Sequence, residues 1–252
     1  MGKLDSRVAI VTGAGQGMGR AVALEFGKEG AKVVVADMAV ETGEETVEMI
    51  TNAGGEATFV KTDVSKSEDV KKMVKIAVEK YGKLNIVYNN AGVLGEAALT
   101  ADATEENWYK VIAVNLIGTW LGMKYAIPEM LKIGGGSIIN VGSAGGQLSQ
   151  RNLAAYCASK NAVAGLSRTA AMEYATKNIR VNVIRPGIIA TPMALGFDEE
   201  TKAKFRAVVP QNRFGEPAEV AKAAVFLASD DSSHITGASL PVDGGLLADS
   251  GY

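Results

Sequence analysis

The sequence predicts an α/β fold: one doubly wound parallel sheet covered by helices on both faces. Short runs rich in valine and isoleucine recur along the chain, and segments with helical periodicity lie between them. Continuous apolar runs of this length are typical of strands buried on both faces. Strands that alternate with helices, joined by right-handed crossovers, form a parallel sheet. A glycine-rich turn directly after the first run strengthens this interpretation.

Seven strands are expected, at residues 8–11, 33–36, 57–60, 84–88, 137–141, 179–184 and 239–242. The clearest helix covers 67–81, where apolar residues form one stripe and Ser65 with Glu68 predicts a capping box. Another helix begins at Glu216-Pro217, with proline at its first position, and runs to about Ala228. Proline and glycine interrupt the pattern over 188–213, which we interpret as a substrate-covering loop with short helices.

Composition limits the function. With 252 residues, 47% of them hydrophobic, the chain is expected to fold as a single domain over residues 1–252. A formal net charge of −2 argues against nucleic acid and anionic membranes as partners. Cys157 and His234 are the only residues of their types, so we expect no disulfide, no metal site and no histidine-based triad. The beginning of the chain has no apolar run long enough for a signal peptide, which favours a cytoplasmic location.

The first strand is followed by the turn Thr12-Gly13-Ala14-Gly15-Gln16-Gly17-Met18-Gly19-Arg20 and then by a helical run. A strand that turns tightly into a helix presents backbone N–H groups and the positive end of a helix dipole, which suits a pyrophosphate. Glycines allow the phosphates to approach the backbone. The strand–turn–helix context favours dinucleotide binding over a turn of purely structural importance.

Asp37 ends the second strand, 18 residues after Gly19. A carboxylate at this place accepts hydrogen bonds from the adenosine ribose and repels a 2′-phosphate. Gln16 in the turn and Met38 beside the aspartate supply no cation to neutralise an additional phosphate. The residues therefore predict NAD rather than NADP. The alternative is that Asp37 only caps the following helix.

Tyr156 and Lys160 are four residues apart in a helical segment, so their side chains are expected on one face. A phenol with a pKa of about 10 is a poor base at neutral pH. Lowering that pKa by about three units takes roughly 4 kcal/mol, which a nearby ammonium and a positive nicotinamide ring would jointly supply. The pair is thus a candidate proton-transfer site, and the alternative is a solvated helix face.

In combination these motifs resemble the short-chain dehydrogenase/reductase family, from Val8 to about Gly245. The resemblance implies a single-domain Rossmann fold and a homotetramer formed through helices and the C-terminal segment. It is carried by the glycine turn, by Asp63-Val64, Asn89-Asn90-Ala91-Gly92, Pro186-Gly187 and Thr191, and by Asn115, Ser143, Tyr156 and Lys160, which match the family's catalytic tetrad in order and spacing.

The resemblance also implies roles. Tyr156 would be the general acid in ketone reduction and the general base in alcohol oxidation, while Lys160 lowers its pKa and holds the nicotinamide ribose. Ser143 would hydrogen-bond the reacting oxygen. Asn115 would organise a proton-relay water through its helix, unless it is a buried amide with no catalytic duty. We therefore predict these cofactor contacts: Gly13, Gln16, Gly17, Met18, Gly19, Asp37, Met38, Asp63, Val64, Asn90, Ala91, Gly92, Tyr156, Lys160, Pro186, Gly187, Ile189, Thr191 and Met193.

The expected substrate pocket is hydrophobic, because most of its lining residues are small or apolar. It would contain Ser143, Gly145, Leu148, Leu153 and Tyr156, with Ala144, Leu94, Met193 and Phe197 nearby and Arg151 within reach by sequence. These residues favour an NAD-dependent dehydrogenase acting on a cyclic or aryl secondary alcohol or ketone. The alternative is an NADPH-dependent reductase of the 3-oxoacyl-carrier-protein type, against which Asp37 argues. A non-catalytic nucleotide sensor is a third possibility, but it would be expected to lack Tyr156 or Lys160.

Overall fold

A computed structural model describes residues 2–248. Within them seven parallel strands form one sheet, as predicted, and the strand order is β3-β2-β1-β4-β5-β6-β7. The predicted domain also included Met1 and residues 249–252, which lie outside the described residues. The strands are β1 (Val8–Thr12), β2 (Lys32–Asp37), β3 (Glu56–Lys61), β4 (Ile86–Asn89), β5 (Gly136–Val141), β6 (Ile179–Pro186) and β7 (Ser239–Val242). The strand order reverses between β1 and β4, so a crevice is expected at their carboxyl ends.

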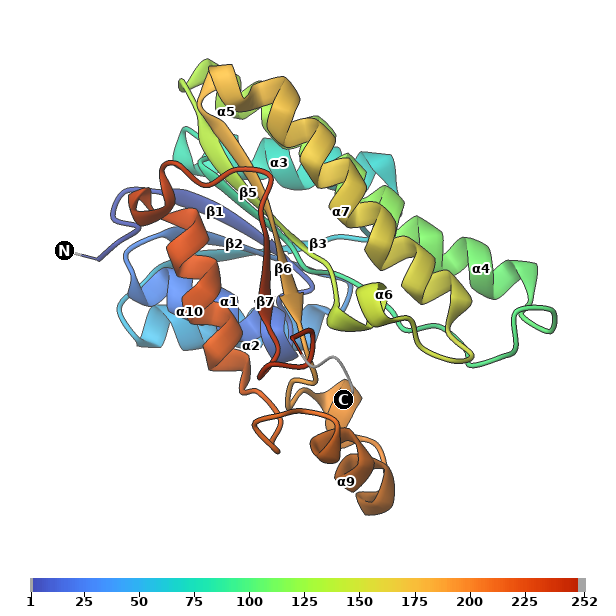
Figure 1. Ribbon diagram of the computed structural model, residues 1–252. Coiled ribbons are helices and arrows are strands. Elements are labelled where there is room, and N and C mark those ends of the chain that lie inside the picture. The colour runs from blue at the N-terminus through green and yellow to red at the C-terminus, as the bar shows by residue number, and fades with distance from the viewer. Residues whose placement is uncertain (1, 249–252) are drawn as a thin grey trace.

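Helices cover both faces of the sheet (Figure 1). One layer contains α1 (Gly17–Lys28), α2 (Val40–Asn52) and α10 (Pro217–Ala228), and the other contains α3 (Ser67–Tyr81), α5 (Gly118–Lys132) and α7 (Ala154–Tyr174). Successive strand residues point to opposite faces, so β1 contributes to two separate cores. Val11 packs into the α1 and α10 layer, whereas Ile10 packs into the α3 and α5 layer. The sheet is therefore buried on both sides, which explains its continuous apolar strands.

The remaining elements are short. They are α4 (Glu105–Ile112), the π-helix η1 (Ala113–Ile117), α6 (Ala144–Leu148), η2 (Ala175–Lys177), α8 (Pro192–Leu195), α9 (Glu199–Ala207) and η3 (Asp230–Ser232). Together, α4, η1 and α5 form one continuous helical run from Glu105 to Lys132. This run is long and apolar enough to span a membrane, but half of its most apolar stretch is buried in the protein. The helices α8 and α9 confirm the short helices predicted within 188–213, and α9 projects away from the sheet (Figure 1).

The two predicted helix starts have different outcomes. At α10 a capping box links Glu216 and Glu219, and Pro217 is the first helical residue, as expected. The capping box predicted for α3 is wrong, because the N-cap residue is Lys66 and no side chain caps the helix. The hydroxyl of Ser65 instead donates to Asp63 Oδ1 at 2.6 Å. A nearby carboxylate thus takes the hydroxyl that the capping box would have used.

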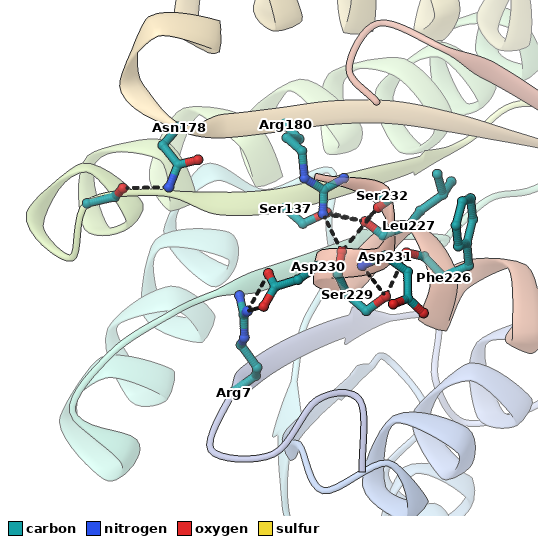
Figure 2. A network of polar contacts seen from close by, with 11 residues as sticks. Arg7, Ser137, Asn178, Arg180, Phe226, Leu227, Ser229, Asp230, Asp231 and Ser232 are labelled. Atoms are coloured by element: carbon teal, nitrogen blue, oxygen red, sulfur yellow. Dashed lines mark hydrogen bonds and ion pairs between the residues drawn. The ribbon is translucent and has the colours of Figure 1, made fainter. Parts of the chain in front are cut away.

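A polar network connects α10 to the amino ends of the strands (Figure 2). The Arg180 guanidinium donates to the carbonyl oxygens of Leu227 at 2.8 Å and Ser229 at 3.0 Å, at the C-terminal end of α10. Burial lowers the pKa of Arg180. Ser137 also donates to the Leu227 carbonyl, and Arg7 pairs with Asp230. These contacts lie at the amino ends of the strands, on the side of the sheet opposite the crevice, and they hold α10 in place.

Candidate active site

The predicted catalytic residues converge at the carboxyl ends of the central strands. Ser143 follows β5, Asn115 lies in η1 between α4 and α5, and Tyr156 and Lys160 belong to the first turns of α7. The glycine turn follows β1 at the same edge of the sheet. This edge, where the strand order reverses, is where ligands bind in open α/β sheets.

The glycine turn has the shape of a phosphate cradle. Gly13 has a φ of 63°, in the left-handed region that favours glycine. Gly19, in the first turn of α1, lies so close to the Gly13 carbonyl that a side chain there would collide with it. The Asn90 amide donates to the carbonyl oxygens of Thr12 at 2.9 Å and Gly13 at 3.2 Å, which fixes the turn. Because the glycines of this turn carry no side chains of their own and lead into the positive end of α1, they fit a dinucleotide pyrophosphate.

The segment after β4 is joined to the turn and to the catalytic side chains. The hydroxyl oxygen of Thr12 accepts hydrogen bonds from the backbone N–H groups of Asn90 at 2.9 Å and Ala91 at 3.1 Å. A methyl group on Gly92 would lie 3.3 Å from both Asn115 Oδ1 and Lys160 Nζ. The predicted contacts Asn90, Ala91 and Gly92 therefore lie between the cradle and the catalytic group.

Asp37 lies beside the cradle rather than capping α2. Its carboxylate accepts from the N–H groups of Gly15 at 2.8 Å and Ala39 at 3.0 Å. The N-cap of α2 is Ala39, without a side-chain cap, so the helix-capping alternative for Asp37 is wrong. Arg20, a cation that follows the turn, pairs with Glu45 at 2.6 Å.

The predicted adenine contacts occupy the ends of β2 and β3. The side chain of Met38 is exposed, while Val64 is buried against Gly118. Burial alone would raise the pKa of Asp63, but hydrogen bonds from Ser65 and the charge of Lys66 outweigh it and hold the pKa below its usual value. Asp63 is therefore an acceptor fixed by its own loop.

Tyr156 and Ser143 form the centre of the site. Ser143 is the N-cap of α6, and its Oγ accepts from the backbone N–H of Gly145 at 3.0 Å. Burial raises the pKa of Tyr156, a hydrogen bond with Ser143 opposes this change, and Cys157 adds to it. The phenol is therefore held in its neutral, proton-donating form next to the serine hydroxyl.

Lys160 lies beneath Tyr156 and is 5% exposed. Its ammonium donates to the carbonyl oxygen of Val141 at 2.9 Å and lies 6.0 Å from the centre of the Tyr156 ring. Burial lowers the pKa of Lys160 to about 8. The expectation that Lys160 lowers the pKa of Tyr156 is not met by these residues alone, because desolvation of the phenol outweighs other effects.

Asn115 connects two parts of the site. Its amide pairs with both backbone groups of Val93, accepting at 2.8 Å and donating at 2.9 Å, and it also donates to Ser159 Oγ at 3.1 Å. Ser159 in turn donates to the carbonyl oxygen of Tyr156 at 2.7 Å. The π-helical turn around Asn115 is of a kind common at functional sites. Asn115 thus has a clear positioning role, and its part in a proton relay remains a prediction.

The segment after β6 borders the cradle from the other side. Thr191 packs over Gly17, where an added methyl group would lie 3.3 Å from Thr191 Cγ2. Pro186 is the last residue of β6, and the backbone N–H of Gly187, which follows it, donates to the carbonyl oxygen of Val242 in β7. Ile189 was predicted to contact the cofactor, but its side chain is buried in the core, so only its backbone can do so. Met193 is exposed on α8.

Of the predicted substrate residues, Gly145 contacts Ser143 directly, and a polar side chain lies against Gly145. Gly145 is buried, Leu148 is exposed and Leu153 is partly buried. Phe197 is partly exposed and meets Phe205 edge to face at 5.3 Å between ring centres. Gln150 was not among the predicted residues, yet its side-chain amide lies against Gly145. The presence of two glutamines between Ser143 and Tyr156 was the only sign in the sequence of a polar group at this place.

Comparisons with known proteins agree with this geometry. A family model described as enoyl-(acyl carrier protein) reductase matches residues 13–247. Cyclohexanol dehydrogenase of Acinetobacter sp. (strain SE19) is 41% identical, over 96% of this chain and 95% of that protein. The 2,5-dichloro-2,5-cyclohexadiene-1,4-diol dehydrogenase LinX of Sphingobium indicum is 39% identical, over 96% of this chain and 97% of that protein. The crystal structure of 3-ketoacyl-(acyl-carrier-protein) reductase from Brucella melitensis complexed with NADH superposes with a TM-score of 0.90 at 36% sequence identity. The match covers 97% of this chain and 99% of that chain.

Proposed function

The chain belongs to the short-chain dehydrogenase/reductase family of oxidoreductases, and from this we propose that it transfers a hydride between NAD(H) and a cyclic secondary alcohol or ketone. One observation carries the proposal. The phenol of Tyr156 lies beside the hydroxyl of Ser143, with the ammonium of the buried Lys160 6.0 Å from its ring centre, at the sheet edge that also holds the glycine cradle.

The side chains account for the proton transfer. In ketone reduction the neutral phenol of Tyr156 gives its proton to the carbonyl oxygen, and in alcohol oxidation the phenolate takes it back. Ser143 accepts from the backbone N–H of Gly145, and its own hydrogen, which lies beside the Tyr156 phenol, would turn to the reacting oxygen of a bound substrate. The Lys160 ammonium, held by Val141, favours the phenolate whenever that form appears.

The glycine turn, Asp37, the 90–92 segment and Lys160 would hold the dinucleotide. When bound, its nicotinamide ring supplies or accepts the hydride. The side chains keep the reacting oxygen between two hydroxyl groups, so that proton transfer and charge stabilisation act on the same atom. Lys160 is buried and Tyr156 is partly buried, which strengthens the electrostatic interactions of both groups.

NAD is the proposed cofactor because of the charges around Asp37. A 2′-phosphate would approach the Asp37 carboxylate, and the adjoining cation Arg20 is already paired with Glu45. Like charges brought this close destabilise a complex. The similar Brucella reductase crystallised with NADH, which supports a non-phosphorylated cofactor.

A cyclic substrate is proposed because Leu148 and Leu153, in the segment between Ser143 and Tyr156, and Phe197, after α8, provide apolar side chains that are not fully buried. The names of two relatives, which include cyclohexanol and a cyclohexadienediol, agree with it. The second candidate is 3-oxoacyl reduction on a carrier protein, which the name of the similar Brucella reductase favours. Its expected cofactor is NADPH, which Asp37 disfavours.

The test is a comparison of two reactions with the purified protein. Cyclohexanol with NAD and an acetoacetyl thioester with NADPH are followed by the near-ultraviolet absorbance of the reduced cofactor. We expect the first reaction to have the higher kcat/KM. A higher value for the thioester would favour the second candidate, and turnover of neither would contradict the proposal.

We also propose that the protein is a cytoplasmic homotetramer. Exposed apolar side chains on α4, η1 and α5, among them Tyr109, Ile117 and Trp120, support association of copies through these helices. The lone, buried Cys157 is compatible with a reducing compartment. Sedimentation velocity tests the first statement, because a species of four chains is expected. Cell fractionation tests the second.

A further inference from the structure

We infer that Gln150 is a specificity-determining residue, which binds a second oxygen on the ring of the substrate. The inference rests on the proposed function and narrows its substrate class from simple cyclic alcohols to cyclic diols, hydroxyketones and diones. The Gln150 amide lies close to the reacting group. A methyl group on Gly145 would lie 2.7 Å from Gln150 Nε2 and 3.2 Å from Oε1, so the amide lies flat against that glycine.

Gly145 in turn adjoins the reacting group. Its backbone N–H donates to Ser143 Oγ at 3.0 Å, so one residue separates the amide of Gln150 from the serine hydroxyl. Gln150 is exposed, and within residues 2–248 its amide has no hydrogen-bond partner. An amide both donates and accepts, so it suits either a hydroxyl or a carbonyl group. A polar group of this kind next to a reacting group can fix the orientation of a ligand.

The backbone holds this side chain in place. Ser149 and Asn152, on either side of Gln150-Arg151, have φ values of 63° and 65°. Such conformations are costly for residues other than glycine and persist where the surroundings enforce them. Here the enforcing contacts are the bond from Gln150 N to Cys157 Sγ at 3.2 Å and the bond from Ala98 N to Asn152 O at 2.9 Å. The amide is therefore presented on a loop fixed at both ends.

Gln147 provides a matched comparison. It is in the same segment and has the same side chain, but its Oε1 accepts from Arg185 Nη1 at 2.9 Å. That amide is therefore committed to an internal contact. A change of Gln147 to leucine removes an amide from the segment without removing the one that lies against Gly145.

The experiment compares kcat/KM for cyclohexanol with kcat/KM for the 1,2-, 1,3- and 1,4-cyclohexanediols. The wild-type enzyme is expected to prefer at least one diol to cyclohexanol. Gln150→Leu is expected to lower the diol-to-cyclohexanol ratio by roughly tenfold, the size of one hydrogen bond, mainly through KM for the diol. Gln147→Leu is expected to leave the ratio unchanged.

The outcomes separate the two levels of the argument. If wild type oxidises both classes and Gln150→Leu keeps the wild-type ratio, the role of Gln150 is refuted while the proposed function stands. An equal fall of the ratio in Gln147→Leu would also refute it, because the effect would then belong to the segment as a whole. If wild type oxidises neither class, the proposed function fails and this inference fails with it. Gln150→Asn keeps the amide on a shorter side chain. Its diol-to-cyclohexanol ratio of kcat/KM is expected to lie between those of Gln150→Leu and wild type.

Discussion

The Asp37 carboxylate accepts a hydrogen bond from the backbone N–H of Gly15 at 2.8 Å. This contact joins the end of β2 to the glycine turn that follows β1, two segments that are neighbours only because their strands pair in parallel. It fixes one carboxylate oxygen against the cradle. The same carboxylate is then available to the adenosine ribose, and its charge is directed at the place where a 2′-phosphate would lie.

Asp37→Ser is expected to narrow the preference for NAD over NADP. The substitution removes the charge that repels the phosphate and weakens a charge-assisted bond to the ribose, together about ten- to a hundredfold in relative kcat/KM. The measurement is kcat/KM for both cofactors with the same alcohol. Asp102→Ser, at an exposed position in a different loop, is the control. An unchanged cofactor ratio in Asp37→Ser would show that another residue selects the cofactor.

Lys160 is expected to make stability depend on pH. Its pKa is about 8 in the folded protein and 10.5 in the reference state, so between these values the unfolded chain binds more protons. Stability contributed by this group therefore rises as the pH increases through that window, and below pH 8 the full cost of burying the charge is present. The total effect is at most about 3 kcal/mol.

The measurement is urea unfolding of wild type and Lys160→Met at several pH values between 8 and 10.5. The free energy of unfolding of wild type should increase with pH relative to that of the variant. Lys177→Met is measured in parallel as a lysine-to-methionine change at an exposed position. A wild-type stability that falls with pH relative to Lys160→Met would contradict the assigned direction of the pKa.

Arg180→Met is expected to destabilise the fold without changing the chemistry. The guanidinium bonds the carbonyl oxygens of Leu227 and Ser229 at the end of α10 (Figure 2), and methionine would leave both without this donor. The cost is about 1–3 kcal/mol. Thermal unfolding gives the loss of stability, while kcat at low temperature should stay near the wild-type value. A large fall in kcat with unchanged stability would mean that the network serves the active site.

Local patterns predicted the sheet and the cradle well, because both depend on short stretches of sequence. Valine-rich runs such as Val33-Val34-Val35 fix a buried strand, and the spacing of Gly13, Gly17 and Gly19 fixes a turn that begins a helix. The strand order confirms the doubly wound arrangement expected from them.

What was missed has no periodic signal in the sequence. The hydroxyl of Ser65 was assigned to a helix cap, but it donates to Asp63, two residues earlier. Ile189 faces the core because its strand-like segment bridges Gly215. The position of the Gln150 amide follows from two residues with positive φ and from contacts to Cys157 and Ala98, none of which has a periodic signal in the sequence.

The central claim is that Tyr156 transfers the proton in an NAD-linked oxidation of a cyclic alcohol. Tyr156→Phe keeps the ring and its packing but removes the hydroxyl that meets Ser143. General acid–base catalysis of this kind contributes about a hundred- to ten-thousandfold. Tyr109→Phe, an exposed tyrosine on α4, is the matched control.

The most direct measurement is the rate of NADH formation from NAD and cyclohexanol, or the diol that wild type prefers, together with the Kd for NADH. We expect Tyr156→Phe to bind NADH as wild type does but to lose at least about a hundredfold in kcat, with Tyr109→Phe unchanged. Near-normal turnover by Tyr156→Phe would contradict the account.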